Sequence, residues 1–313
     1  MERTLRRPGG WLVAWLALSL AACGGGSVPS SAASPALSPT PTIAATAKAS
    51  PSLAPTVGEF DVGSGRKLHL ECIGEGSPTI VIEVGNDDTI HGSWDAVFGP
   101  MARVSRVCAY DRANLGRSDP HPGPRTINGL GDDLVTLLHV AEVSGPYVVV
   151  GGSFGGNIVG VLAANHPEEV AGLVFVDSDP INDDPALDPL RVNLTDEQYA
   201  ACCADPSQYE PPFDAPENTE RIDWAASRKL ELASVDNLPR VPTAVITATR
   251  PDCEPDWPCD RIAASIAKLQ ALWIEDNPEG TQVVVNSGHV VQRDAPMEIV
   301  DETRKIVDAV RGN

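Results

Sequence analysis

Hydrophobic and polar positions divide the chain into alternating strand-like and helix-like stretches. Seven short apolar, β-branched runs have the composition of strands buried on both faces, at 67–72, 79–84, 107–110, 147–150, 173–176, 243–249 and 282–285. Between them, apolar residues recur at helical spacing, at 94–98, 130–140, 158–162, 262–269 and 299–310. This alternation predicts an α/β fold, a mostly parallel sheet with helices on both faces.

Two features depart from the regular alternation. The first two runs, 67–72 and 79–84, precede any helix and predict an antiparallel hairpin at one edge of the sheet. Residues 178–240, after the run 173–176, are rich in Asp, Pro, Glu and Ala. A segment of this length inside a compact domain is usually functional. We interpret it as a small helical cap over the carboxyl ends of the strands, with a surface insertion of no role as the alternative.

The first residues have the features of a secretory signal. Three arginines among the first seven residues precede an apolar run at 11–20 and then Leu-Ala-Ala-Cys, ending at Cys23. This ending resembles a bacterial lipobox, which implies a signal peptide over 1–22 and a lipid such as palmitate on Cys23. The alternatives are an ordinary signal with an incidental cysteine and a transmembrane anchor, although the run is short against the roughly 20 residues a bilayer needs.

The next segment has the composition of a linker. Residues 24–57 consist largely of Gly, Ser, Pro, Ala and Thr, with Lys48 as the one charged residue and no aromatic residue. Such a segment cannot bury enough apolar surface to offset the entropy of ordering. We predict a linker over 23–57 and one folded domain over 58–313. The chain would then be secreted and tethered through Cys23 to the outer face of the bacterial cell membrane.

Charge and cysteine content limit the kinds of partner and metal site that we expect for this chain. The net charge is −20, so binding of nucleic acid or of an anionic membrane by the domain is not expected. If Cys23 carries a lipid, six of the seven cysteines remain, and an even number in an oxidising compartment favours disulfides. The spacing of Cys253 and Cys259 is not that of a usual zinc pair, and no histidine lies near Cys202 and Cys203. We expect no metal and no cofactor, and the sequence indicates no oligomeric state.

The strongest chemical signal is a Gly-x-Ser-x-Gly motif around Ser153. It follows the apolar run 147–150 and precedes a helical pattern, which is the context this motif requires. Gly151 and Gly155 suit the tight turn, because the turn strains the backbone and packs helix closely on strand. The helix start directs backbone N–H groups at a developing negative charge, so the N–H of Phe154 is a candidate oxyanion donor. The motif alone also fits a glycine-rich turn with an inert serine.

With these neighbours the chain resembles the α/β-hydrolase superfamily, from about residue 59 to residue 310. Residues 106–119, 145–147 and 166–177 are similar to the family's fourth, fifth and sixth strands and their connections. The resemblance implies the α/β-hydrolase fold, with a mostly parallel eight-stranded sheet, helices on both faces, and 178–240 as a helical cap between strands 6 and 7. In the family the residues matching 106–119 are scaffold.

The resemblance also places a base and an acid. His289 follows the last strand in a Gly-His turn before the C-terminal helix, and keeps the chain order serine, acid, histidine. Asp252 follows the seventh strand, the usual family location of the acid, and is our first choice. Asp177 ends the sixth strand, a location that some relatives use, and could reach the same histidine. Asp256 and Asp260 in the loop of Asp252 also stay open.

Relatives often carry His-Gly in the turn after strand three, where the second oxyanion donor lies. This chain has Val84-Gly85-Asn86 there, so the backbone N–H of Asn86 is the match. Gly152 likewise stands where a histidine often precedes the serine. Neither departure removes a backbone donor.

The family's strand order also suggests disulfides. Cys72 and Cys108 fall on strands two and four, which are neighbours in this fold, so they could lie within the roughly 4.4–6.8 Å that a disulfide needs between Cα atoms. We predict that bond. The cap cysteines Cys202 and Cys203 could then pair with the loop cysteines Cys253 and Cys259, joining cap to loop in an undetermined pairing.

Together these features predict a serine hydrolase that cleaves a carboxylic ester through a Ser-His-Asp triad and an acyl-enzyme. Its substrate would be a small-molecule ester or amide. One alternative is a peptidase similar to proline iminopeptidases, whose caps grip a free amine with acidic residues; this cap contains Asp183, Asp184, Asp188 and Glu210. Another is a non-catalytic surface-binding lipoprotein that keeps the fold.

Overall fold

The computed structural model describes residues 56–179, 186–203, 210–251 and 253–312. The predicted signal peptide over 1–22, the lipidation of Cys23 and the linker as far as residue 55 lie outside the described residues, as does Asp252. The first strand begins at Thr56, inside the predicted linker. No helix in the described ranges has the length and apolar character needed to cross a membrane.

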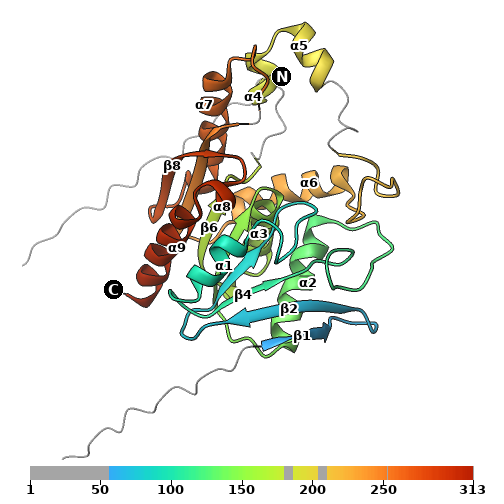
Figure 1. The fold of residues 1–313 in the computed structure, drawn as a ribbon, viewed down its shortest axis with the longest axis vertical. Coiled ribbons are helices and arrows are strands. Elements are labelled where there is room, and N and C mark those ends of the chain that lie inside the picture. Colours follow the sequence, from blue (N-terminus) through green and yellow to red (C-terminus); the bar gives the residue numbers. More distant parts are fainter. Residues whose placement is uncertain (1–55, 180–185, 204–209, 252, 313) are drawn as a thin grey trace, which may run out of the picture. The chain divides into compact units, whose positions relative to one another are not determined.

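Eight strands form one sheet in the order β1-β2-β4-β3-β5-β6-β7-β8 (Figure 1). Strand β2 runs antiparallel to β1 and to β4, and the other neighbours are parallel. The predicted α/β-hydrolase fold with a mostly parallel sheet is therefore confirmed. The strands are β1 (Thr56–Asp61), β2 (Lys67–Ile73), β3 (Ile80–Glu83), β4 (Val107–Tyr110), β5 (Tyr147–Gly152), β6 (Val170–Val176), β7 (Thr243–Arg250) and β8 (Gly280–Gly288).

The antiparallel edge differs from the prediction. The hairpin is formed by β1 and β2, whereas the runs 67–72 and 79–84 were expected to pair. The second of these runs is β3, which β4 separates from β2. Strand β1 carries no apolar run, because its residues alternate between partly buried and exposed positions at the sheet edge. An edge strand of this kind gives little hydrophobic signal in a sequence.

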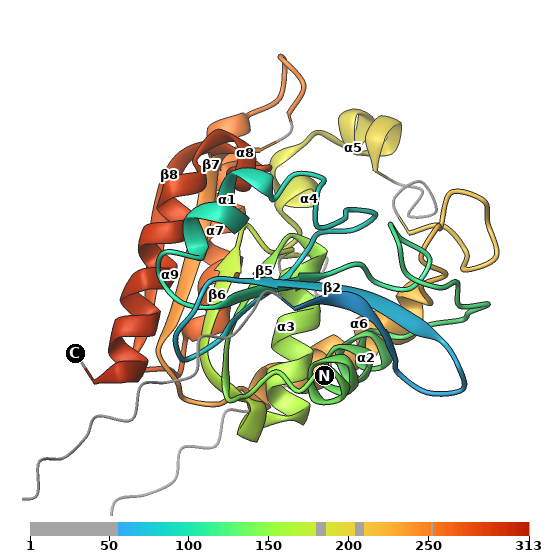
Figure 2. The ribbon, with the colours of Figure 1, turned by 60° about the horizontal axis from the view of Figure 1, so that its bottom comes forward.

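Helices cover both faces of the sheet (Figure 2). Val148 and Val150 of β5 pack in one core with α1 (Asp95–Met101) and α9 (Pro296–Arg311), and Val149 packs in the other core with α2 (Ile127–Val140) and α3 (Phe154–Asn165). This alternation is the period of two that a strand buried on both faces imposes. The helices outside the cap segment are α1 (Asp95–Met101), α2 (Ile127–Val140), α3 (Phe154–Asn165), α7 (Cys259–Gln270), α8 (Val291–Asp294) and α9 (Pro296–Arg311), with 3₁₀ turns at Pro167–Glu169 and Ala271–Ile274.

The segment between β6 and β7 is helical in its described parts, as predicted. It contains α4 (Pro189–Asn193), α5 (Asp196–Cys202), α6 (Trp224–Ser234) and a 3₁₀ turn at Val235–Asn237. The last of these helices, α6, lies beside two helices that flank the sheet. It packs on α2 and α3, with the Trp224 and Phe154 ring centroids 4.9 Å apart and the Ile127 N–H donating to Ser227 Oγ at 3.0 Å. Helix α6 is therefore part of the body of the domain.

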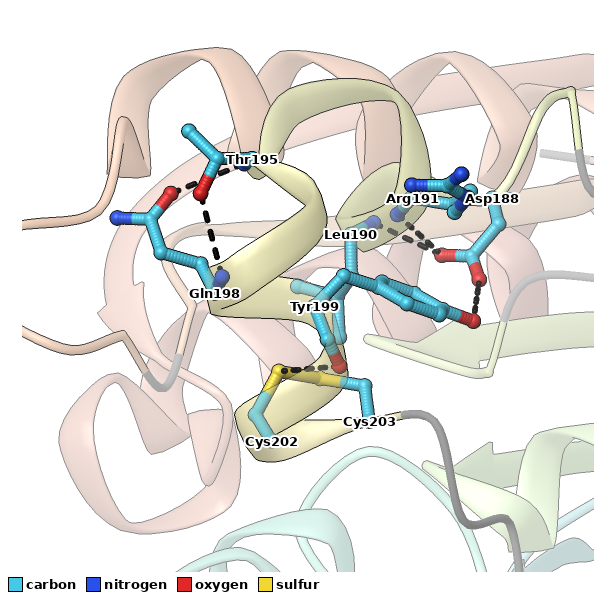
Figure 3. Close-up of a disulfide and its surroundings, with 8 residues drawn as sticks. All are labelled: Asp188, Leu190, Arg191, Thr195, Gln198, Tyr199, Cys202 and Cys203. Carbon is cyan, nitrogen blue, oxygen red and sulfur yellow. Dashed lines mark hydrogen bonds between the residues drawn. A yellow bond between two sulfur atoms is a disulfide. The ribbon is translucent and has the colours of Figure 1, made fainter.

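The disulfides confirm one predicted pairing and correct the other. Cys72 and Cys108 face each other in the register of β2 and β4 and are bonded. The predicted link between cap and loop is wrong: Cys202 is bonded to Cys203 at the end of α5 (Figure 3). The remaining pair, in residues 253–259, closes the turn that enters α7. Both of these disulfides join cysteines that are close together in the sequence. No disulfide in the described part of the chain therefore joins the cap to this loop.

Peptide mapping under non-reducing conditions tests this pairing. Cleavage after Arg191, Arg221, Arg240 and Arg261 places 202–203 and 253–259 in separate peptides. We expect each peptide alone, lighter by two hydrogen atoms than its reduced form. The Cys72–Cys108 pair, whose cysteines fall in different peptides, provides the cross-linked positive control. A cross-linked species that joins the cap peptide to the loop peptide would contradict the pairing.

Candidate active site

Ser153 occupies a strained turn between β5 and α3. Its φ of 52° and ψ of −132° lie in a region that residues with a side chain rarely adopt. The turn is held from both sides, because the Ser153 N–H donates to Val176 O at 3.0 Å and the Gly156 N–H donates to Ser153 O at 2.8 Å. The serine thus stands at the carboxyl edge of the parallel strands, fixed by β6 and by the first turn of α3.

The surrounding glycines are required by close backbone contacts. A Cβ on Gly151 would lie 2.5 Å from the Gly155 carbonyl oxygen, and a Cβ on Gly155 would overlap the carbonyl oxygens of residues 83 and 84. A Cβ on Gly152 would lie 2.7 Å from Cζ2 of Trp94. The departure noted at Gly152 therefore has a steric cause, since Trp94 fills the space that a histidine side chain would need.

His289 links the serine to an acid. Its Nε2 lies 3.0 Å from Ser153 Oγ, and its Nδ1 lies 2.7 Å from Asp177 Oδ2. The structure thus brings together Ser153, His289 and the second of our two candidate acids. Asp252, the first choice, lies outside the described residues. Asp256 and Asp260 are exposed.

Asp177 is held so that one carboxylate oxygen stays directed at the histidine. Its other oxygen, Oδ1, accepts from the Ala248 N–H at 3.0 Å and from Gln270 Nε2 at 3.1 Å. Gln270 also donates to Ser178 O at 2.9 Å and accepts from Thr247 Oγ1 at 2.7 Å. Gln270 was not among the residues predicted from the sequence, although a polar residue four positions after Ile266 on the apolar stripe of a helix is a usable signal.

We expect Gln270→Leu to lower kcat by about 10- to 100-fold with little change in KM. The leucine cannot hold the carboxylate, and a small misplacement of a catalytic group is costly. Steady-state kinetics on a p-nitrophenyl ester measures this. Gln282→Leu is the matched control, because Gln282 also donates to Thr247 Oγ1, at 2.9 Å, but has no described contact with Asp177. Equal losses in both variants would contradict a positioning role for Gln270.

Both predicted oxyanion residues lie beside the serine. Phe154 is the first residue of α3, so its N–H has no acceptor within the helix. Gly85 approaches from the other side, where a Cβ on it would be 3.6 Å from Ser153 Cβ, and Asn86 follows it. The loop after β3 and the start of α3 thus bracket the serine.

A buried charge cluster fixes the loop that carries Asn86. Arg112, with 1 % of its surface exposed, donates to both carboxylate oxygens of Glu220, at 2.6 Å from Nε and 2.5 Å from Nη2. It also donates to Glu83 Oε1 at 2.6 Å, to Val84 O at 2.7 Å and to Gly85 O at 2.6 Å. One guanidinium therefore holds the two carbonyls that precede Asn86.

The cluster continues through neighbouring groups. Glu220 Oε1 also accepts from the Asp87 N–H at 3.0 Å, and Tyr110 Oη donates to Glu83 Oε2 at 2.6 Å. Burial raises the pKa of Glu83, and Arg112 offsets this in part. Burial alone would lower the pKa of Arg112, but its carboxylate partners raise the pKa overall and keep the guanidinium charged. Residues 106–119 thus include scaffold, as the family resemblance implies, and this scaffold acts directly on the loop.

Two cavities border Ser153, and a third borders His289. One of about 250 Å³, which we call the acid-lined cavity, borders Ser153 and Phe154 and is lined further by Asp179, Glu210 and Glu231. Two others of about 320 Å³ each border His289; one also touches Ser153, and the second lies between α4 and α7. No three His, Cys, Asp or Glu side chains of the described residues gather as a metal site would require.

The four acidic cap residues named from the sequence have different positions. Glu210 lines the acid-lined cavity. Asp188 instead caps α4 by accepting from the Leu190 N–H at 2.8 Å, and it also accepts from Tyr199 Oη at 3.3 Å (Figure 3). Asp183 and Asp184 lie outside the described residues. Among the four, in the described part of the chain, only Glu210 lines a cavity that borders Ser153.

Comparison with known proteins now identifies the family. A sequence model described as the alpha/beta hydrolase family matches residues 89–302, more than half of the chain. The chain belongs to the alpha/beta hydrolase family. This confirms the family resemblance, and it makes the protein a hydrolase by family.

Curated relatives of this hydrolase share only part of their length with it. It is 34 % identical over 145 residues to the lipase LipV of Mycobacterium tuberculosis, covering 46 % of this chain and 51 % of that protein. It is 32 % identical over 130 residues to a 2-hydroxymuconate semialdehyde hydrolase of Pseudomonas sp. strain CF600, covering 41 % and 46 %. In the relatives with the strongest matches, the matched part makes up only 15 to 26 % of the relative's own length.

Solved structures agree with this hydrolase in fold. A serine hydrolase involved in carbazole degradation, the CarC enzyme, superposes with a TM-score of 0.54 at 19 % identity, covering 82 % of this chain and 100 % of that one. At this identity the likeness establishes the fold alone.

Proposed function

We propose that this hydrolase is a serine hydrolase that cleaves carboxylic esters of small molecules through an acyl-enzyme. The observation that carries the proposal is the continuous set of contacts from Ser153 Oγ through His289 to Asp177, at 3.0 and 2.7 Å. Such a set supplies a nucleophile, a base and a group that orients the base. The partial similarity to a lipase and to a semialdehyde hydrolase supports the same class.

In the acylation step, His289 Nε2 takes the proton of Ser153 Oγ while the oxygen attacks the ester carbonyl carbon. The negative charge moves to the carbonyl oxygen, where the N–H groups of Phe154 and Asn86 donate to it. Asp177 stabilises the imidazolium that forms. The imidazolium then gives its proton to the alcohol oxygen, and the C–O bond to the alcohol breaks.

In the deacylation step, His289 removes a proton from water, and the resulting oxygen attacks the acyl carbon. The same two N–H groups hold the second oxyanion. The bond between the acyl carbon and Ser153 Oγ breaks, Ser153 regains its proton from His289, and the carboxylic acid leaves. Every proton in this cycle is carried by side chains of the chain itself.

A fluorophosphonate probe and a p-nitrophenyl acyl-ester series test the proposal on the full chain in detergent. We expect labelling of the wild type and none of Ser153→Ala, together with turnover that identifies the preferred acyl length. Labelling without turnover of any ester in the series would direct the assay to aminoacyl amides, the substrates of the peptidase alternative. Absence of both labelling and turnover would favour the non-catalytic binding lipoprotein.

We further propose that the chain is exported and tethered by a lipid on Cys23. The support is the sequence alone, namely the basic start, the apolar run and the Leu-Ala-Ala-Cys ending at Cys23. We expect labelled palmitate to enter the wild-type chain in a bacterial host and to be absent from Cys23→Ala. Equal labelling of both would contradict this proposal without affecting the one on catalysis.

A further inference from the structure

The cavity between α4 and α7 borders His289 and has mainly apolar walls. We call it the α4–α7 cavity, and its volume is about 320 Å³. This volume is at the lower end of the roughly 300–1,000 Å³ that is typical of small-molecule sites. The aliphatic side chains of its lining come from α4, from the end of β7 and from α7, and are those of Pro189, Leu190, Pro251, Ile262 and Ile266. The cavity is therefore suited to an apolar group of a small molecule.

Most charged and amide side chains of this lining already have partners. Asp177 and Gln270 are hydrogen-bonded to each other and to neighbouring backbone groups. Asp188 caps α4 and accepts from Tyr199 Oη at 3.3 Å. Asp179 lies at the border, because it also lines the acid-lined cavity. A ligand in the α4–α7 cavity therefore meets mostly aliphatic side chains, and burying apolar surface against them is favourable.

The cap wall of this cavity is attached to the body of the domain. Asn193, the last residue of α4, donates from Nδ2 to Ser265 Oγ of α7 at 2.9 Å and to Pro189 O at 2.8 Å. At the start of the same helix, Asp188 accepts from the Leu190 N–H at 2.8 Å. Both ends of this short helix are thus held. The wall that carries Leu190 is therefore in place before a ligand binds, as is usual for small-molecule sites.

Reaction geometry assigns the α4–α7 cavity to one side of the ester. The acyl carbon is bonded to Ser153 Oγ in the acyl-enzyme, so the acyl group must begin in a cavity that borders Ser153. The alcohol oxygen takes its proton from His289, so the alcohol begins beside the histidine. Among the described residues, the lining of the α4–α7 cavity includes His289 and does not include Ser153. The cavity therefore fits the alcohol rather than the acyl group.

The two cavities that border Ser153 are less suited to a long apolar chain. The acid-lined cavity has two aromatic side chains but carries three carboxyl groups. The other cavity carries Asp87 and Asp88. An aliphatic chain placed against such groups removes water from them without supplying hydrogen bonds, which is unfavourable. A long acyl chain is therefore disfavoured in both, whereas a long alcohol finds apolar surface in the α4–α7 cavity.

We propose that the α4–α7 cavity binds the alcohol part of the ester, so that the preferred substrates are short-acyl esters of apolar alcohols. This inference rests on the proposed serine-hydrolase function and specifies its substrate class. Leu190 and Ile266, one from each wall, supply contacts that select a long alcohol. The alcohol is still attached when Ser153 attacks, so these contacts act on acylation and not on deacylation. Selectivity for the alcohol is therefore measured by kcat/KM, which reports the steps up to acylation.

Isomeric esters separate the two sides of the substrate. Hexyl acetate and ethyl hexanoate contain the same atoms, but the long chain is in the alcohol of the first and in the acyl group of the second. We measure kcat/KM for both, and for ethyl acetate, with the full chain in detergent. Each buried methylene contributes a factor of about four, so four partly buried methylenes should place hexyl acetate about 10- to 100-fold above ethyl acetate. Ethyl hexanoate should exceed ethyl acetate by less than about fourfold.

Variants of the two walls test the residues. Leu190→Asn places a polar group of similar size in the cavity wall. We expect it to lower the ratio of kcat/KM for hexyl acetate to that for ethyl acetate by about 4- to 16-fold, as one or two methylenes lose apolar contact. Ile266→Thr should change this ratio in the same direction, and it serves if Leu190→Asn does not fold. Val192→Asn is the matched control, because Val192 is also on α4 but is 50 % exposed and outside the lining, so the ratio should stay unchanged.

The outcomes separate this inference from the proposed function. If kcat/KM for hexyl acetate is no higher than for ethyl hexanoate, or if both wall variants keep the wild-type ratio, the inference is overturned while turnover leaves the proposed function intact. A wild type that reacts with the fluorophosphonate probe but hydrolyses none of the three esters would overturn the inference and keep the serine nucleophile. Absence of both labelling and turnover would overturn the proposed function, and this inference with it.

Discussion

Replacing Asp177 by asparagine is expected to lower kcat for the preferred p-nitrophenyl ester by about 10⁴-fold. An amide in this position can donate to His289 Nδ1, which favours the imidazole tautomer that cannot accept the serine proton. It also cannot stabilise the imidazolium. Because the amide is nearly the same size as the carboxylate, the contacts of Oδ1 with Ala248 and Gln270 lose little of their geometry.

The Asp252→Asn variant, measured in the same assay as Asp177→Asn, decides which of the two aspartates acts as the acid. If Asp177 is the catalytic acid, Asp252→Asn should keep kcat within a few-fold of the wild type. Asp256→Asn, an exposed change in the same loop, controls for the loss of charge there. A 10⁴-fold loss in Asp252→Asn, with a small effect of Asp177→Asn, would return the role to the usual family position.

Arg112→Met is expected to reduce the free energy of unfolding by about 3–5 kcal/mol. The methionine fills much of the side-chain volume but leaves the carboxylates of Glu83 and Glu220 buried without their cation. It also leaves the carbonyls of Val84 and Gly85 without their donor. A loss of this size is a large part of the 5–15 kcal/mol that stabilises a typical domain.

Urea denaturation of the full chain, followed by Trp fluorescence, measures the loss. Arg117→Met is the control, since Arg117 belongs to the same segment but is 61 % exposed and its contact with Glu59 is a surface ion pair. We expect the control to change the free energy of unfolding by less than about 1 kcal/mol. Similar destabilisation in both variants would show that the buried cluster contributes no more to the free energy of unfolding than a surface ion pair does.

The sequence was informative where the chemistry is local. The turn around Ser153 needs glycines at fixed offsets, so its position could be predicted from a few adjacent residues. The Cys72–Cys108 bond was predictable because strand order in the family makes its two strands neighbours. His289 could be singled out because it directly follows the last strand before the C-terminal helix.

Features that depend on distant partners were harder to predict. Either strand end that carries an aspartate could reach His289, so the sequence left Asp177 and Asp252 open. The ion pair of Arg112 with Glu220 joins residues 108 positions apart, and no local pattern announces it. The cap and loop cysteines were wrongly paired because each pair closes within its own segment, Cys202 with Cys203 and Cys253 with Cys259, and spacing along the chain does not distinguish this from a link between the two segments.

The position of Glu220 limits how this hydrolase can be re-engineered. A cap that is inserted between two strands looks like a segment that can be replaced by the cap of another protein. Here, however, the insertion supplies the Glu220 carboxylate, which accepts hydrogen bonds from Arg112 and from the Asp87 N–H. Asp87 is next to Asn86, the residue proposed to donate to the oxyanion. A transplanted cap that lacks an acid at the position of Glu220 would bring a new pocket but would also remove an anchor of the loop that carries Asn86. A productive graft would therefore join after residue 179 and before residue 218, and leave the return into α6 native.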